Sequence, residues 1–263
     1  MTWDLLTDPV FRLPFLAGLL LAGVLPVLGV LLMLRDEWLA ALGLAHLAAA
    51  GALAGLAAGV PAVAGAALGA ALGGGVKALT QARGNAAYGF MILIGWSAMM
   101  LAAANTPVGD ALGHALVDGQ LYFAGVTELT ASLILAALAG LGVPWLGPRL
   151  VRARLFPRHD RANRLPAWRW HLGFDPLAAL GMAVGTATLG LMGAFALVLV
   201  PAWIGFRIAP AWRWTLALGA LIGVGGYVAA FALALRLDQP FGPVLVAVLL
   251  AGAALSVRLA PRR

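Results

Sequence analysis

The segment from Arg149 to Arg169 reads RLVRARLFPRHDRANRLPAWR and contains seven arginines in 21 residues. It stands between long apolar runs, and the 263-residue chain as a whole is 63% hydrophobic and only 10% charged. Apolar runs of about 20 residues recur on both sides of it, long enough to cross a hydrocarbon core of about 30 Å as helices. Their Ala, Leu and Gly content, without strict alternation, favours helices over a barrel. The sequence therefore predicts an all-α polytopic membrane protein with a single domain over residues 1–263.

The charge and motif content excludes several classes of function. The net charge is +7, but the basic residues lie in short connectors between apolar runs, where they set orientation rather than bind nucleic acid. The absence of cysteine excludes disulfides, thiolate metal sites and cysteine catalysis. There is no P-loop pattern, and Ser97 and Ser132 have no recognisable hydrolase partners, so we expect no enzyme. Residues 1–12 carry Asp4 and Asp8 before any basic residue, which favours a retained first helix over a cleaved signal peptide.

Nine membrane spans are predicted, at about 13–34, 38–58, 61–76, 86–104, 121–146, 168–189, 190–204, 214–235 and 243–257. The third is nearly all Ala and Gly, which suits close packing against other helices. Eight spans are the alternative, because without a break at Gly190 the region 174–204 could form one long tilted helix. Nine spans place 15 of the 17 basic residues on the side of the Arg149–Arg169 segment, and eight spans place 11 there. The positive-inside rule therefore favours nine spans, with the N-terminus outside and the C-terminus cytoplasmic.

Two ionisable residues inside apolar spans are candidates for a translocation path. His46 lies on the second span, where an ionisable group is costly and is a functional candidate by default. The alternative, equally weighted, is a hydrogen bond from its imidazole to a neighbouring carbonyl. Glu128 lies about seven residues inside the predicted fifth span, or close enough to the outer interface to be solvated.

Two further groups of polar residues favour plainer interpretations. His171 and Asp175 are four residues apart, on one face of a helix, and could suit a metal. Their place at the start of the sixth span favours an interfacial role instead. The loop before the fifth span contains a small acidic patch with one histidine, for which a solvated loop is the simpler interpretation; its residues are Asp110, His114 and Asp118.

Three segments together resemble the membrane subunit of zinc- and manganese-type ABC importers. Leu34 to His46 contains LRDEW followed by a helix with LAH, similar to a turn and helix of that family at the same spacing. Gly190 to Ala202 ends in VPA, and Leu237 to Pro243 reads LDQPFGP, which resembles the family's turn before its last helix. Val117 to Leu129 resembles the stretch before the fifth span. The order and spacing of these segments extend the resemblance over nearly the whole chain.

The resemblance implies a permease fold related to the vitamin B12 and iron-siderophore type. It also implies a homodimer of permeases in a bacterial inner membrane, with cytoplasmic ABC ATPase subunits and an extracytoplasmic solute-binding protein as partners. A divalent metal, zinc or manganese, would be the cargo, with no cofactor bound by this chain. His46 would line the path.

The resemblance also assigns a role to the middle of the basic segment. In that family a short cytoplasmic helix docks on the ATPase, and its counterpart here is Phe156 to Pro166. Phe174 to Pro176 looks superficially similar but leaves too little chain before Gly190 for a span. The coupling residues implied in this way are Arg158, His159, Asp160, Arg161 and Arg164.

One departure from the family pattern concerns the cargo. The family has an aspartate four residues before the histidine of the second span, and Leu42 stands at that position. A lone imidazole binds a divalent cation less well than a carboxylate–histidine pair. Another group such as Glu128 could complete the site, the site could be transient, or the cargo could be another chelate such as iron-siderophore or cobalamin. A non-transport intramembrane enzyme or scaffold is the alternative from a different class.

Overall fold

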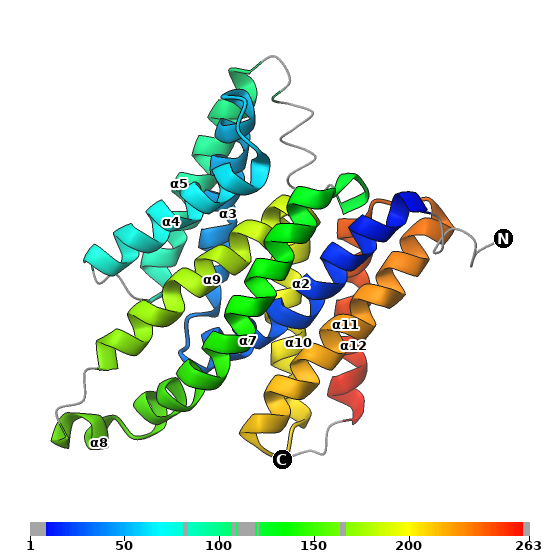
Figure 1. Cartoon of the computed structure of the whole chain (residues 1–263). Coiled ribbons are helices and arrows are strands. Elements are labelled where there is room, and N and C mark those ends of the chain that lie inside the picture. Colours follow the sequence, from blue (N-terminus) through cyan, green and yellow to red (C-terminus); the bar gives the residue numbers. More distant parts are fainter. Residues whose placement is uncertain are drawn as a thin grey trace.

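The structure is a computed structural model and describes residues 9–80, 84–106, 109, 119, 121–163 and 167–259. These residues are helical almost throughout, as Figure 1 shows. In chain order the elements are α2 (Pro9–Leu34), α3 (Trp38–Ala57), α4 (Ala62–Thr80), α5 (Asn85–Ala104), the 3-10 turn η1 (Leu121–Phe123), α7 (Val126–Leu155), α8 (Pro157–Ala162), α9 (Ala167–Leu189), α10 (Leu191–Ile208), α11 (Trp212–Leu237) and α12 (Phe241–Leu259). The predicted all-α polytopic fold is confirmed.

A break at Gly190 separates α9 from α10. Gly190 has φ 82° and ψ 162°, a conformation that favours glycine because it has no Cβ. The alternative of one helix over 174–204 is therefore wrong. In the described part of the chain, eight helices are long and apolar enough to cross a membrane, and the apolar segment Ala62–Lys77 of α4 is shorter.

The helix α7 differs from the predicted fifth span at both ends. It begins at Val126 rather than near residue 121, and it continues to Leu155 through the first part of the basic segment. Pro144 and Pro148 lie inside it without ending it. Basic residues in its last turn complement the negative end of the helix dipole, and the helix stops only before Pro157. The first arginines of the basic segment are thus helical.

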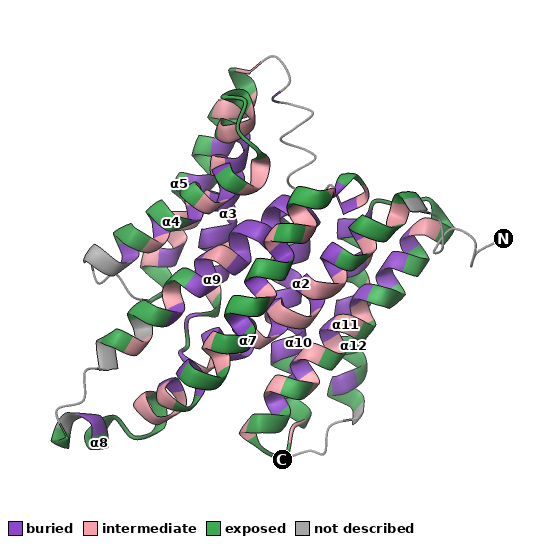
Figure 2. Ribbon diagram, in the orientation of Figure 1, coloured by how far each residue is buried: buried purple, intermediate pink, exposed green. Residues whose placement is uncertain are grey.

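The helix α2 lies at the centre of the larger group of helices, packed against α7, α9, α10 and α11 (Figure 1). Leu21, Leu25, Leu28 and Leu31 on α2 are almost completely buried. Their spacing of three and four residues puts them on one face of the helix. Figure 2 colours the helices by burial, and the buried residues are concentrated on the inner helices while the exposed ones lie on the outer faces.

The helices α3, α4 and α5 form a second packed group (Figure 1). Gly51 and Gly55 of α3 face Gly65 and Gly69 of α4, and a Cβ on Gly51 would lie 2.9 Å from the Gly69 Cα. The two backbones touch because these glycines have no side chains, as in other small-residue helix interfaces. The predicted close packing of the small-residue segment is confirmed.

Aromatic side chains pack at the end of the bundle where α2 begins. Tyr227 and Phe231 of α11 contact Phe15 of α2, with ring centroids 5.8 Å and 5.2 Å from it. The Tyr227 hydroxyl donates a hydrogen bond to the Phe15 carbonyl at 3.1 Å. Tyr122 in η1 joins this cluster, and burial, with a smaller effect from Asp238, raises the pKa of its phenol to about 12. These contacts hold η1 against the start of α2 and against α11 and α12.

Candidate functional site

His46 is buried on α3, with 7% of its surface exposed. Its Nδ1 lies 2.9 Å from the Leu42 carbonyl oxygen one turn earlier. Because a carbonyl oxygen only accepts, this contact places the proton on Nδ1 and leaves a lone pair on Nε2. The hydrogen bond to a neighbouring carbonyl, which was one of the two interpretations, is therefore present. It also holds the ring in a tautomer that can bind a metal.

The helix α5 passes directly over His46. Gly95 is buried, and it touches the backbone and Cβ of His46. No side chain at position 95 would fit between the two helices without moving one of them. No local sequence pattern indicates this contact, because Gly95 is one of 34 glycines and lies 49 positions from His46.

Glu128 lies in the first turn of α7 rather than deep inside a span. Its Oε2 accepts a hydrogen bond from the Gly125 N–H at 2.8 Å. A glutamate at the third helical position that binds the N-cap amide satisfies one of the donors left over at a helix start. Of the two predicted positions, the one about seven residues inside the span was wrong, because residues 121–125 precede the helix as η1 and the N-cap. Glu128 therefore has a local role at the start of α7.

Acidic and histidine side chains do not gather around His46 into a preformed cage. Among the residues that the structure describes, there is no group of three or more His, Asp and Glu side chains placed to hold a metal ion. The acidic patch of the predicted outer loop and the side chain of His171 lie outside the described residues.

The short helix α8 lies between α7 and α9 and occupies most of the predicted docking segment Phe156–Pro166 (Figure 1). Pro157 is its first residue, a position where a missing N–H costs nothing. Arg158 and His159 are exposed. Arg164 and the side chain of Arg161 lie outside the described residues.

Asp160 is the exception among the predicted coupling residues, because it is buried. Only 4% of its side chain is exposed, and its Oδ1 accepts from Arg152 Nε at 2.9 Å. Arg152 belongs to the last turns of α7, so this ion pair folds α8 back onto α7. Asp160 therefore holds α8 in place, whereas Arg158 and His159 present side chains outward.

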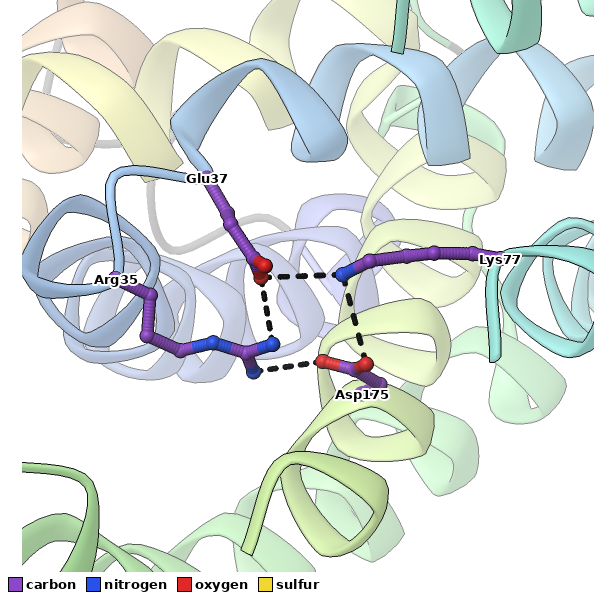
Figure 3. A network of polar contacts seen from close by, with 4 residues as sticks. All are labelled: Arg35, Glu37, Lys77 and Asp175. Atoms are coloured by element: carbon purple, nitrogen blue, oxygen red, sulfur yellow. Dashed lines mark hydrogen bonds and ion pairs between the residues drawn. The ribbon is translucent and has the colours of Figure 1, made fainter. Parts of the chain in front are cut away.

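Four charged residues form a closed ring that the sequence analysis did not find (Figure 3). Arg35 binds Glu37 at 2.6 Å and Asp175 at 2.6 Å, and Lys77 binds Glu37 at 3.1 Å and Asp175 at 3.5 Å. Positive and negative groups alternate around the ring, and each contacts two of the opposite sign. Between 4% and 13% of each side chain is exposed. Two charges of each sign are thus buried together with no net charge.

The ring joins parts of the chain that are far apart in sequence. Arg35 and Glu37 flank the turn between α2 and α3, Lys77 is near the end of α4, and Asp175 is on α9. Asp175 was expected to lie beside His171 at the membrane interface, at the start of the sixth span. The structure shows its carboxylate paired with Arg35, 140 positions away. The sequence did indicate that these charged residues need partners, because unpaired charges in apolar helices are costly. Nothing local, however, indicated which partners these would be.

Residues 8–259, almost the whole chain, match the ABC 3 transport family. The chain belongs to the ABC 3 transport family. As a member it is a multi-pass permease subunit of a transporter and not an enzyme. A comparison with curated proteins found no match.

Two solved structures have the same fold as this ABC 3 family member. PsaBC from Streptococcus pneumoniae, in complex with Fab, superposes with a TM-score of 0.85 and 16% identity, over 99% of this chain and 95% of that one. An inward-facing transporter described as of the metal-chelate ABC type superposes with a TM-score of 0.69 and 16% identity, over 94% and 85%. The arrangement of α2 to α12 is therefore an ABC transporter permease fold.

Proposed function

We propose that this ABC 3 family permease imports a divalent metal ion, zinc or manganese, across a bacterial inner membrane. The observation that carries the proposal is His46, a buried histidine in the middle of a membrane helix with its Nδ1 held and its Nε2 lone pair available. Neutral imidazole is a common ligand of such ions. The sequence resemblance to zinc- and manganese-type importers points the same way.

The remaining parts of the complex follow from the same proposal. Two copies of the chain would enclose the path, a soluble binding protein would deliver the ion from outside, and cytoplasmic ATPase subunits would dock on α8. The exposed Arg158 and His159 are suitable contacts for that ATPase. The ion is cargo, and no resident cofactor is needed.

The basic end of the molecule supports a cytoplasmic location for α8. Arg149 lies over the rings of Trp145 and Trp170, 4.5 Å and 4.9 Å from their centroids. Tryptophans and arginines gather in this way at membrane–water interfaces, and arginines favour the cytoplasmic side. With nine spans, the N-terminus would lie outside and the C-terminus inside.

A second candidate cargo is a metal chelate rather than a bare ion. The side chain at position 42 is an apolar leucine, so His46 lacks the carboxylate one turn earlier that would complete a strong ion site. One of the solved structures that share this fold is described as a metal-chelate type ABC transporter. Iron-siderophore or cobalamin import is therefore the alternative.

The test is uptake by the complete complex in proteoliposomes with its own ATPase and binding protein. We expect ATP-dependent uptake of radioactive zinc or manganese, and a large loss in the His46→Ala variant at unchanged membrane insertion. Uptake of a ferric siderophore or cobalamin with neither metal would favour the second candidate. Equal metal uptake by wild type and His46→Ala at all concentrations would remove His46 from the path.

A further inference from the structure

The ring Arg35–Glu37–Lys77–Asp175 connects the helix that follows α8 with the helix that carries His46. The helix α9 follows α8 in the chain and carries Asp175, and α3 begins directly after Glu37. His46 lies nine residues beyond Glu37 on α3, about 13 Å along the helix axis at 1.5 Å per residue. The ring thus lies between the predicted ATPase contact and the predicted ion contact.

We propose that Asp175 is a positioning residue that passes the displacement of α9 to α3 through its ion pair with Arg35. This inference rests on the proposed function, because it assumes that an ATPase moves α8. The pair is short, at 2.6 Å, and joins α9 to the turn from which α3 starts. Lys77 and Glu37 brace it from α4 and from the same turn (Figure 3).

Burial makes this connection stiff. The Arg35 side chain is 4% exposed and that of Asp175 is 13% exposed, so water screens the pair little. Separating either charge from the ring would leave it uncompensated in an apolar region, which is strongly unfavourable. A displacement of α9 therefore carries the α2–α3 turn with it more readily than it breaks the ring.

Two cavities border the ring, one beside Asp175 and one beside Arg35 and Glu37. A cavity of about 410 Å³ lies between α4 and α9, lined by small side chains such as Ala67, Ala71 and Ala179 and by Asp175 itself. A second cavity of about 320 Å³ is lined by Arg35 and Glu37 of the ring. The helix α9 also packs directly against α3 and α4, so the test must separate the contribution of the ring from that of this packing.

Two double variants test the proposal, because each removes one positive and one negative charge and leaves one intact pair. Lys77→Met with Asp175→Asn leaves Arg35–Glu37 and disconnects α9 from the turn. Lys77→Met with Glu37→Gln leaves Arg35–Asp175 and keeps the connection. The measurement is the amount of metal imported per ATP hydrolysed by the complete complex in proteoliposomes.

We expect the disconnected variant to import about five- to tenfold less metal per ATP than the connected one, within the usual range of coupling between sites. Asp175→Glu keeps the negative charge in an otherwise native ring. A ratio of imported metal to ATP close to that of the wild type in this variant would support the same conclusion. Equal ratios in the two double variants, whether both high or both low, would overturn the proposal. A wild-type complex that transports no metal would instead contradict the proposed function.

A second measurement uses the intact ring and needs no cargo. The chain has no cysteine, so spin labels can be attached at Leu172 on α9, Trp38 on α3 and Trp214 on α11, which are all exposed. Between the ATP-free and ATP-trapped complexes, we expect the Leu172–Trp38 distance to stay constant while the Leu172–Trp214 distance changes. A change in the Leu172–Trp38 distance would overturn the proposal, even if the double variants failed to fold.

Discussion

Gly95 lies so close to His46 that a Cβ on the glycine would be 2.7 Å from the His46 Cβ. This separation is shorter than any real contact between two such carbon atoms. The glycine thus sets how closely α5 approaches α3, and with it the space around the imidazole.

Replacing Gly95 with alanine should push α5 away from α3. Overpacking of this kind costs about 1–3 kcal/mol, and we expect a lower melting temperature together with reduced metal uptake. The matched control is Gly89→Ala on the same helix, because a Cβ there meets nothing within 4 Å. Thermal unfolding in detergent and uptake in proteoliposomes would measure both, and equal behaviour of the two variants would contradict the packing role of Gly95.

Replacing Leu42 with aspartate should strengthen metal binding at His46. The new carboxylate would stand one turn before the imidazole on the same face of α3, and we expect roughly tenfold tighter binding of zinc or manganese. Leu42→Asn is the control, with a similar shape and no charge. Calorimetry on the permease in nanodiscs would measure the affinity. Identical affinities in wild type, Leu42→Asp and Leu42→Asn would show that no ion binds beside His46.

Breaking the Arg152–Asp160 pair should detach α8 from α7. Arg152→Ala and Asp160→Ala should each lower the ATPase activity that transport stimulates. The double variant should lose little more than either single one, because both remove the same contact. Arg154→Ala provides the control, since Arg154 is an exposed arginine on the same helix end. Additive losses in the double variant would mean that the two residues act separately.

Glu128 offers two substitutions that separate capping from ion binding. Glutamine can still accept from the Gly125 N–H, so Glu128→Gln should keep both stability and metal uptake. Glu128→Ala removes the cap and should lower stability by about 1 kcal/mol. The readouts are the melting temperature and uptake. Loss of uptake with normal stability in Glu128→Gln would instead place the carboxylate in the ion path.

The number of spans predicts where the two ends of the chain lie. With α4 crossing the membrane there are nine spans, and cysteines introduced as Asp8→Cys and Arg263→Cys should react with a membrane-impermeant maleimide from opposite sides. The chain's lack of native cysteine makes the labelling unambiguous. Reaction of both from one side would require an even number of spans.

The sequence predicted those features that depend on neighbouring residues. The break at Gly190 was expected from the distribution of basic residues over the connectors, and the glycine's positive φ explains it. The extension of α7 to Leu155 was missed because prolines and arginines suggested a loop. Arg35, Lys77 and Asp175 were each visible as charges, but their pairing depends on the packing of α4 and α9 against the α2–α3 turn.

The charge balance of the ring also limits how far voltage can act on the ring. An unpaired charge moved across the full membrane potential does work of about 2.3 kcal/mol for each 100 mV. Arg35 and Lys77 are matched by Glu37 and Asp175, so a helix that carries the whole ring with it moves no net charge. Movement of the intact ring therefore transfers no net charge, and the membrane potential neither drives nor opposes that movement.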